Sequence, residues 1–196
     1  METNNVDLGP VAAGMARLAE GIDDAQLGDA TPCPAYTVRE LLAHVVGLCT
    51  AFRDAGRKDL GPTTDTDPET VEYVLDAGWR TELPRLLEEL TAAWRRPDAW
   101  EGFTRAGGID LPASVAGQIA LNELLVHGWD LARATGQDYA PDEASLAVSY
   151  ALLEPDEDDQ GREGMFGPVV PVGPGASLRD RVIGLSGRRP DWKPGK

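Results

Sequence analysis

Residues 122–136, NELLVHGWDLARATG, contain the side chains whose types and spacing are best suited to chemistry. This segment holds His127, one of two histidines in the chain, and a glutamate four residues earlier, Glu123. On an α-helix four residues advance about 400°, so the two side chains would lie about 40° apart and about 6 Å along the axis. A carboxylate and an imidazole at that spacing reach one divalent metal from the same helix face. The second histidine, His44, is the candidate third ligand.

Two histidines and one glutamate leave at least one coordination position of a metal open. Catalytic zinc is held in this way, whereas closed cages of four ligands are structural. The same set is the facial triad of non-haem iron, so the sequence leaves zinc, nickel, manganese and iron as alternatives. A water bound to such a metal becomes more acidic, and a bound thiol is deprotonated.

The same residues also have an interpretation without a metal. His44 follows Leu41 by three residues and precedes Leu48 by four, so it points inward with them. An inward histidine needs a hydrogen-bond partner or a metal, and a core residue satisfied by a hydrogen bond is one outcome. The pair of Glu123 and His127 is, in the same interpretation, only a pair on a helix surface.

Two neighbours of His127 are candidate supporting residues. Asp130 either orients His127 as a second carboxylate or is an exposed partner of Arg133 three residues later. Trp129 is either an aromatic wall beside the metal or a simple packing residue.

The two cysteines are too few for a disulfide scaffold and lack Cys-x-x-Cys spacing, so we expect free thiols. Cys49 falls in an apolar helical run and is expected in the core. Cys33, in a stiff loop between two prolines, is a candidate for exposure. A nucleophilic pair of Cys33 and His44 is an alternative chemistry, although no residue near Cys33 would orient it.

The first two helices are predicted from capping residues and apolar spacing. Asp7 can cap a helix whose buried face is Val11, Met15, Leu18 and Ile22. Thr37 and Glu40 form a Thr-x-x-Glu capping box, which predicts that a second helix carrying His44 begins there.

The next two helices complete a bundle. Asp67 and Pro68 predict the start of a third helix that continues to Trp94, kinked or split at Pro84. Residues 100–110 contain glycine, lack helical periodicity and are expected to include a brief extended piece. A fourth helix, opened by Asp110 and Pro112, carries Glu123 and His127 and ends at Gly136.

After Gly136 the pattern is weaker. Residues 142–154 are a plausible fifth helix, residues 155–164 are expected to form an exposed acidic loop, and residues 166–177 are rich in Pro and Gly and extended. Ser177 can cap a final short helix. We therefore expect one all-α domain over residues 1–196, with a four-helix bundle at 5–136 and a C-terminal helix and extended wrap at 137–196.

Composition excludes several classes of partner. Eighteen basic and thirty-three acidic residues give a formal charge of −15, which repels nucleic acid and anionic membranes. No apolar run approaches the roughly 18 residues that span a bilayer, and the first ten residues lack the features of a secretory signal. The expected location is the cytoplasm, and the expected state is a monomer or homodimer.

Three segments together resemble a known family: TPCPAYTVRELLAHVVG at 31–47, residues 122–136, and FGPVVPVGPGASLRDRVIGLSGRRPDW at 166–192. They look like actinobacterial metal-binding proteins of the DinB/YfiT-like superfamily. These are similar to the metal-binding domain of mycothiol-dependent maleylpyruvate isomerase. The resemblance covers nearly the whole chain.

The resemblance implies a DinB/YfiT-like four-helix bundle that binds one divalent metal, most simply zinc, through His44, Glu123 and His127. It also implies a low-molecular-weight thiol, mycothiol or bacillithiol, as cosubstrate. The predicted function is a metal-dependent thiol transferase or isomerase acting on an electrophilic substrate. The alternative is a non-catalytic module of the same fold that binds a metal or small molecule. Candidates for recognising a substrate carboxylate are Arg39, Arg105 and Arg133.

Overall fold

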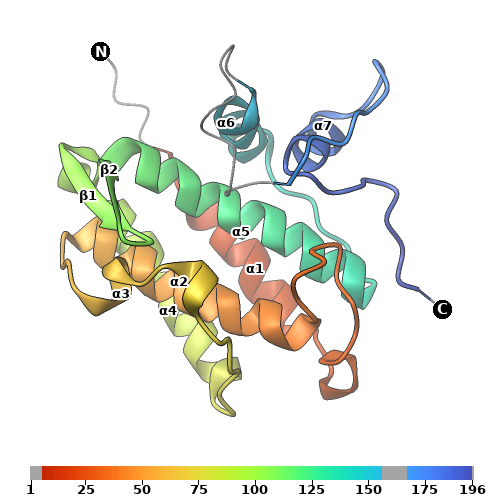
Figure 1. The fold of residues 1–196 in the computed structure, drawn as a ribbon, viewed down its shortest axis with the longest axis horizontal. Helices are drawn as coiled ribbons and strands as arrows, with labels where there is room; N and C mark the ends of the chain where they lie inside the picture. The colour runs from red at the N-terminus through yellow and green to blue at the C-terminus, as the bar shows by residue number, and fades with distance from the viewer. Residues whose placement is uncertain (1–5, 156–166, 196) are drawn as a thin grey trace.

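The computed structural model describes residues 6–155 and 167–195 of the chain. Four helices form a bundle: α1 (Gly9–Glu20), α2 (Val38–Arg57), α4 (Trp79–Trp94) and α5 (Ala113–Thr135). Helix α2 packs against α4 and α5, and α1 packs against the same two helices, so α1 and α2 lie diagonally opposite (Figure 1). The expected four-helix bundle is confirmed.

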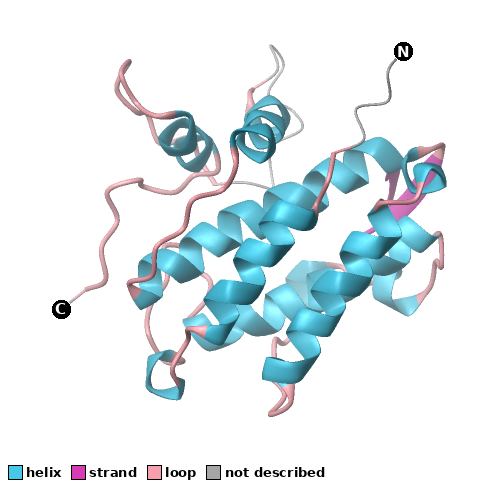
Figure 2. Ribbon diagram, turned by 180° about the vertical axis from the view of Figure 1, so that it is seen from behind, coloured by secondary structure: helices cyan, strands magenta, loops and turns pink. Residues whose placement is uncertain are grey.

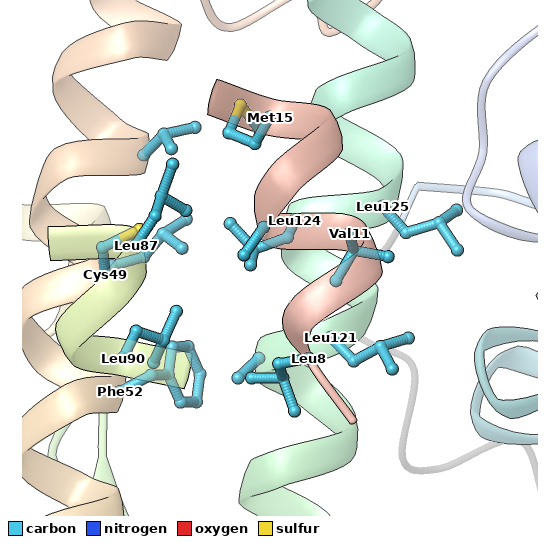
Figure 3. Close-up of a cluster of buried hydrophobic side chains, with 14 of the residues drawn as sticks. Leu8, Val11, Met15, Cys49, Phe52, Leu87, Leu90, Leu121, Leu124 and Leu125 are labelled. Carbon is cyan, nitrogen blue, oxygen red and sulfur yellow. The ribbon is translucent and has the colours of Figure 1, made fainter. Parts of the chain in front are cut away.

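The bundle encloses one continuous apolar core. Figure 3 shows buried side chains of this core from all four helices, among them Leu8, Val11, Met15, Cys49, Phe52, Leu87, Leu90, Leu121, Leu124 and Leu125. Cys49 is fully buried in this core, as predicted, and both cysteines are free thiols. The indole N–H of Trp94 is satisfied within this core, since it donates to the carbonyl oxygen of Phe52 over 2.9 Å.

The predicted helix starts near the N-terminus are confirmed. Asp7 Oδ1 accepts a hydrogen bond of 2.9 Å from the backbone N–H of Gly9, the first residue of α1. At the start of α2, Thr37 Oγ1 accepts from the backbone N–H of Glu40, and Glu40 Oε2 accepts from that of Thr37 over 2.8 Å. This reciprocal pair fixes the first turn of the helix that carries His44.

The predicted start of the third helix is wrong. Pro68 begins only a short 3₁₀ turn, η2 (Pro68–Thr70), and α4 starts at Trp79. Asp76 Oδ1 accepts a hydrogen bond from the backbone N–H of Gly78, and this local turn, with the flexibility of glycine, places the boundary after residue 76. The helix continues unbroken past Pro84, so it is not split there. The preceding linker also contains a short helix, α3 (Pro62–Asp65).

A two-stranded hairpin covers one end of the bundle (Figures 1 and 2). Strands β1 (Phe103–Ala106) and β2 (Ile109–Pro112) pair antiparallel, so the expected extended piece is confirmed. Gly107 and Gly108 form the turn with φ of 61° and 77°, a conformation that glycine adopts without strain. Two further 3₁₀ turns, η1 (Asp24–Gln26) and η3 (Pro97–Trp100), lie in the connections.

The C-terminal part packs on the outer side of α5. Helix α6 (Glu143–Leu153) contacts α5 and α7 (Leu178–Leu185), as Figure 2 shows from behind. Asp142 and Ser177 cap these helices, which confirms the predicted fifth and final helices. The expected acidic loop lies almost wholly outside the described residues. In the described parts of the chain, every helix is too short or too polar to cross a membrane.

Candidate metal centre

The three predicted ligands meet between the first half of α2 and the middle of α5. Nε2 of His127 lies 3.1 Å from Oε2 of Glu123, and Nε2 of His44 lies 3.7 Å from the same oxygen. One donor atom from each residue lies within 4.8 Å of the other two. The bundle therefore brings His44, from a distant part of the sequence, to the Glu–His pair on α5.

The donor set fits a divalent metal. Ligand atoms about 2.1 Å from a tetrahedral metal lie about 3.4 Å from one another, and the two observed separations, 3.1 and 3.7 Å, lie on either side of this value. The side chains of His44 and His127 are 11% and 7% exposed and that of Glu123 is 23% exposed, so Glu123 is the most exposed of the three candidate ligands.

Asp130 orients His127. Its Oδ2 lies 3.0 Å from Nδ1 of His127, and its side chain is fully buried. A carboxylate on Nδ1 fixes the imidazole so that Nε2 faces the centre, which is the usual outer-shell arrangement of a metal-binding histidine. The alternative, an exposed partner of Arg133, is wrong because Asp130 is buried and pairs with a different arginine.

That arginine is Arg188, which the sequence did not single out. It follows α7, and its Nη2 donates to Asp130 Oδ2 over 3.2 Å while Nη1 donates to the carbonyl oxygen of Ser186 over 2.8 Å. Its Nε is buried and has no hydrogen-bond partner among the described residues, like Oδ1 of Asp130. Asp130 and Arg188 are 58 positions apart in the sequence. The residues around Arg188 therefore do not indicate that its side chain is buried against Asp130.

Aromatic rings pack on His44, which, unlike His127, has no carboxylate of the described residues on Nδ1. The ring of Tyr36 stacks on it at 5.1 Å between centroids, and the ring of Tyr73 meets it edge-on at 4.9 Å. Nδ1 of His44 is buried without a hydrogen-bond partner among the described residues. The two tyrosines were not predicted, because ring contacts between separate segments leave no spacing pattern in the sequence.

The pKa shifts of the three donors define the charges of the metal-free centre. Burial raises the pKa of Glu123, but the two imidazoles together hold it well below its usual range. Burial lowers the pKa of His127, but Asp130 and Glu123 outweigh it and raise that pKa to about 9. Burial lowers the pKa of His44. At neutral pH the centre therefore holds a carboxylate, one imidazolium and one neutral imidazole.

Cys33 is buried, so its expected exposure is wrong. Thr31 holds its loop, since Oγ1 of Thr31 accepts from the backbone N–H of Cys33 and lies 2.8 Å from the carbonyl oxygen of Tyr36, to which it donates. Burial raises the pKa of the Cys33 thiol, with Arg188 opposing this effect. A protonated thiol is a poor nucleophile, which disfavours the pair of Cys33 and His44.

The three arginines considered for carboxylate recognition are engaged elsewhere or exposed. Arg105 pairs with Asp65 and Asp110 at the hairpin. Arg133 donates to the carbonyl oxygen of Trp192, and Arg39 is exposed in the first turn of α2. Within the described residues, Arg188 is the arginine that contacts the centre, through Asp130.

Comparisons with known proteins agree with this architecture. The family model of the mycothiol maleylpyruvate isomerase N-terminal domain matches residues 8–132. Two uncharacterized proteins of Mycobacterium tuberculosis, from strains CDC 1551 / Oshkosh and ATCC 25618 / H37Rv, are each 28% identical over 144 residues. The match covers 71% of this chain and 74% of each relative.

Two solved structures have a similar fold. The crystal structure of the mycothiol-dependent maleylpyruvate isomerase aligns with a TM-score of 0.64 at 21% identity, over 94% of this chain and 88% of that one. A histidine-to-alanine mutant of that enzyme aligns with a TM-score of 0.63 at 21% identity and the same coverage. The similarity in fold thus extends beyond the matched bundle into the C-terminal part.

Proposed function

The chain belongs to the family of the mycothiol maleylpyruvate isomerase N-terminal domain, and on that premise we propose that it is a metal-dependent enzyme using a low-molecular-weight thiol of the mycothiol type. His44, Glu123 and His127 would hold one divalent metal, with zinc the first choice for two imidazoles and a carboxylate. The reaction class is thiol transfer or thiol-assisted isomerisation of an electrophilic substrate.

The observation that carries the proposal is the convergence of three donor atoms within 4.8 Å from two helices. Three protein ligands leave room on a metal for an exogenous ligand. A metal bound there would lower the pKa of a coordinated thiol, so that the thiol is present as its thiolate.

The surrounding residues have separate tasks in this proposal. Asp130 holds the ring of His127, and Tyr36 keeps water from one face of His44. Arg188 balances the buried charge of Asp130. Its unpartnered Nε can donate one further hydrogen bond, which suits an anionic group of a substrate.

Elemental analysis of protein purified without an affinity tag tests the metal centre. We expect about one equivalent of metal after exposure to zinc, nickel, manganese or iron. His44→Ala and Glu123→Gln should each lose it, while Glu88→Gln, at an exposed position of α4, should retain it. A wild-type protein that takes up none of these metals would overturn the proposal.

A turnover assay then tests the chemistry. Metal-loaded protein is incubated with mycothiol and a panel of electrophiles that includes maleylpyruvate, and product formation is followed by mass spectrometry. We expect turnover that Glu123→Gln abolishes and Glu88→Gln preserves. Stoichiometric metal with no turnover on any electrophile would instead favour the non-catalytic binding module.

A further inference from the structure

The segment between η2 and α4 passes directly over the metal centre. Residues 71–76, here called the strap, are extended and cross α2 (the gold segment in Figure 1). Within the described part of the chain, residues 72–75 make no backbone–backbone hydrogen bond. The strap is therefore attached to the bundle by its side chains.

Two inward side chains of the strap provide that attachment. Tyr73 meets the ring of His44 at 4.9 Å and that of Tyr36 at 5.6 Å, and its hydroxyl donates to the carbonyl oxygen of Pro68 over 3.1 Å. Leu75 is half-buried against the core. The intervening Val74 is 77% exposed, so the strap alternates between inward and outward side chains.

The elements around His44 differ in how freely they can move. His127 lies inside α5, and Tyr36 directly precedes the capping box that starts α2. Moving His127 would break helical hydrogen bonds, and moving Tyr36 would break the bonds that its backbone makes with Cys33 and Thr31. Moving Tyr73 requires that its ring contacts, its side-chain hydrogen bond with Tyr36 and its bond to Pro68 are lost, and segments held by few contacts open at the lowest cost.

We propose that the strap is a gate of the metal centre: Tyr73 closes it over His44, and the strap lifts to admit a bulky thiol. The closed position rests on the contact between Tyr73 and His44, which involves no metal. The identity of the admitted ligand as a thiol rests on the proposed function. With Tyr73 in place, the side chain of His44 is only 11% exposed.

Acylation of the histidines by diethyl pyrocarbonate in metal-free protein tests the gate directly. The chain has two histidines, so peptide mass spectrometry reports each rate separately, with His127 as the internal reference. Tyr73→Ala should raise the acylation rate of His44 on the order of tenfold, because the ring contacts that keep the strap closed are lost. The acylation rate of His127 should stay nearly unchanged. Val74→Ala, on the same strap, should change neither rate.

Two results would overturn the gate. One is an unchanged rate at His44 in Tyr73→Ala. The other is an equal rise at both histidines, which would show loosening of the whole bundle. Tyr73→Phe keeps the ring and removes the hydrogen bonds of the hydroxyl to Pro68 and Tyr36, so it should remain close to wild type if the ring is the gate. A rise as large as that of Tyr73→Ala would also contradict the ring-based gate.

Thiol binding to the cobalt-loaded protein separates this inference from the proposed function. Absorbance changes give the association rates of mycothiol and of the small thiol 2-mercaptoethanol. Tyr73→Ala should increase the association rate of mycothiol more than that of 2-mercaptoethanol. If thiols bind with equal rates in both proteins, the gate is wrong; if no thiol binds to either, the proposed function fails and the acylation result alone decides the gate.

Discussion

Metal binding to this centre should release one proton, and that proton comes from His127. Asp130 and Glu123 outweigh burial and raise the pKa of His127 to about 9. The pKa of His44 is lowered by burial, and that of Glu123 is held low by the imidazoles, so both are already free of protons at neutral pH. A metal therefore competes with a proton at one of its three ligands.

The size of this competition follows from the pKa of His127. At pH 7, about two units below a pKa of about 9, the proton weakens the apparent metal affinity by roughly 100-fold, or about 3 kcal/mol. As the pH rises from 7, the apparent metal affinity should increase about tenfold per pH unit. The proton's competition should end near pH 9, because His127 of the metal-free protein is deprotonated above its pKa.

Calorimetric titration with zinc in buffers of different ionisation enthalpy measures the proton count, and competition with a chelator measures the affinity. We expect close to one proton per metal from His127 at pH 7, with Glu88→Gln indistinguishable from wild type. Two protons per metal would mean that His44 is also charged or that a water bound to the metal has ionised. An affinity that does not change between pH 7 and 9 would refute the assigned charges of the centre.

Three further substitutions test other parts of the argument. Asp130→Asn removes the largest interaction that raises the pKa of His127, so the plateau of metal affinity should move to lower pH in the same titration. Gly117→Ala should lower the free energy of unfolding in urea by about 2 kcal/mol. The new Cβ would lie 2.5 Å from a buried indole ring, and relieving this overlap should cost about 3 kcal/mol. The higher helix propensity of alanine returns only about 1 kcal/mol. Gly28→Ala, with no atom within 4 Å of the new Cβ, is the matched control and should be near neutral. Thr37→Ala removes a capping hydrogen bond of α2 and should cost about 1 kcal/mol in the same urea assay.

The sequence determined those features that depend on neighbours along the chain. The Thr37 capping box and the left-handed Gly136 set the start of α2 and the end of α5, because capping is satisfied within a few residues. The spacing of Glu123 and His127 likewise places both side chains on one face of a helix. That His44 turns inward follows from the apolar residues around it. These local relations were sufficient to predict the bundle and to select the three candidate ligands.

The third helix shows where local patterns were insufficient. Its apolar residues before Gly78 have helical spacing, yet residues 71–76 are extended and Tyr73 lies on His44. A helix of six residues has little stability by itself, so the side-chain contact of Tyr73 with His44 on α2 outweighs the helical spacing.

Only the tertiary structure decided the surroundings of the centre. The contacts of Arg188 with Asp130 and of Tyr73 with His44 join segments that are separate in the sequence. Burial then set the protonation of the donors, because the same carboxylate changes the pKa of His127 far more in the interior than in water. A sequence specifies hydrogen bonds between near neighbours, but the energy of a contact between distant residues exists only once the chain has packed them together.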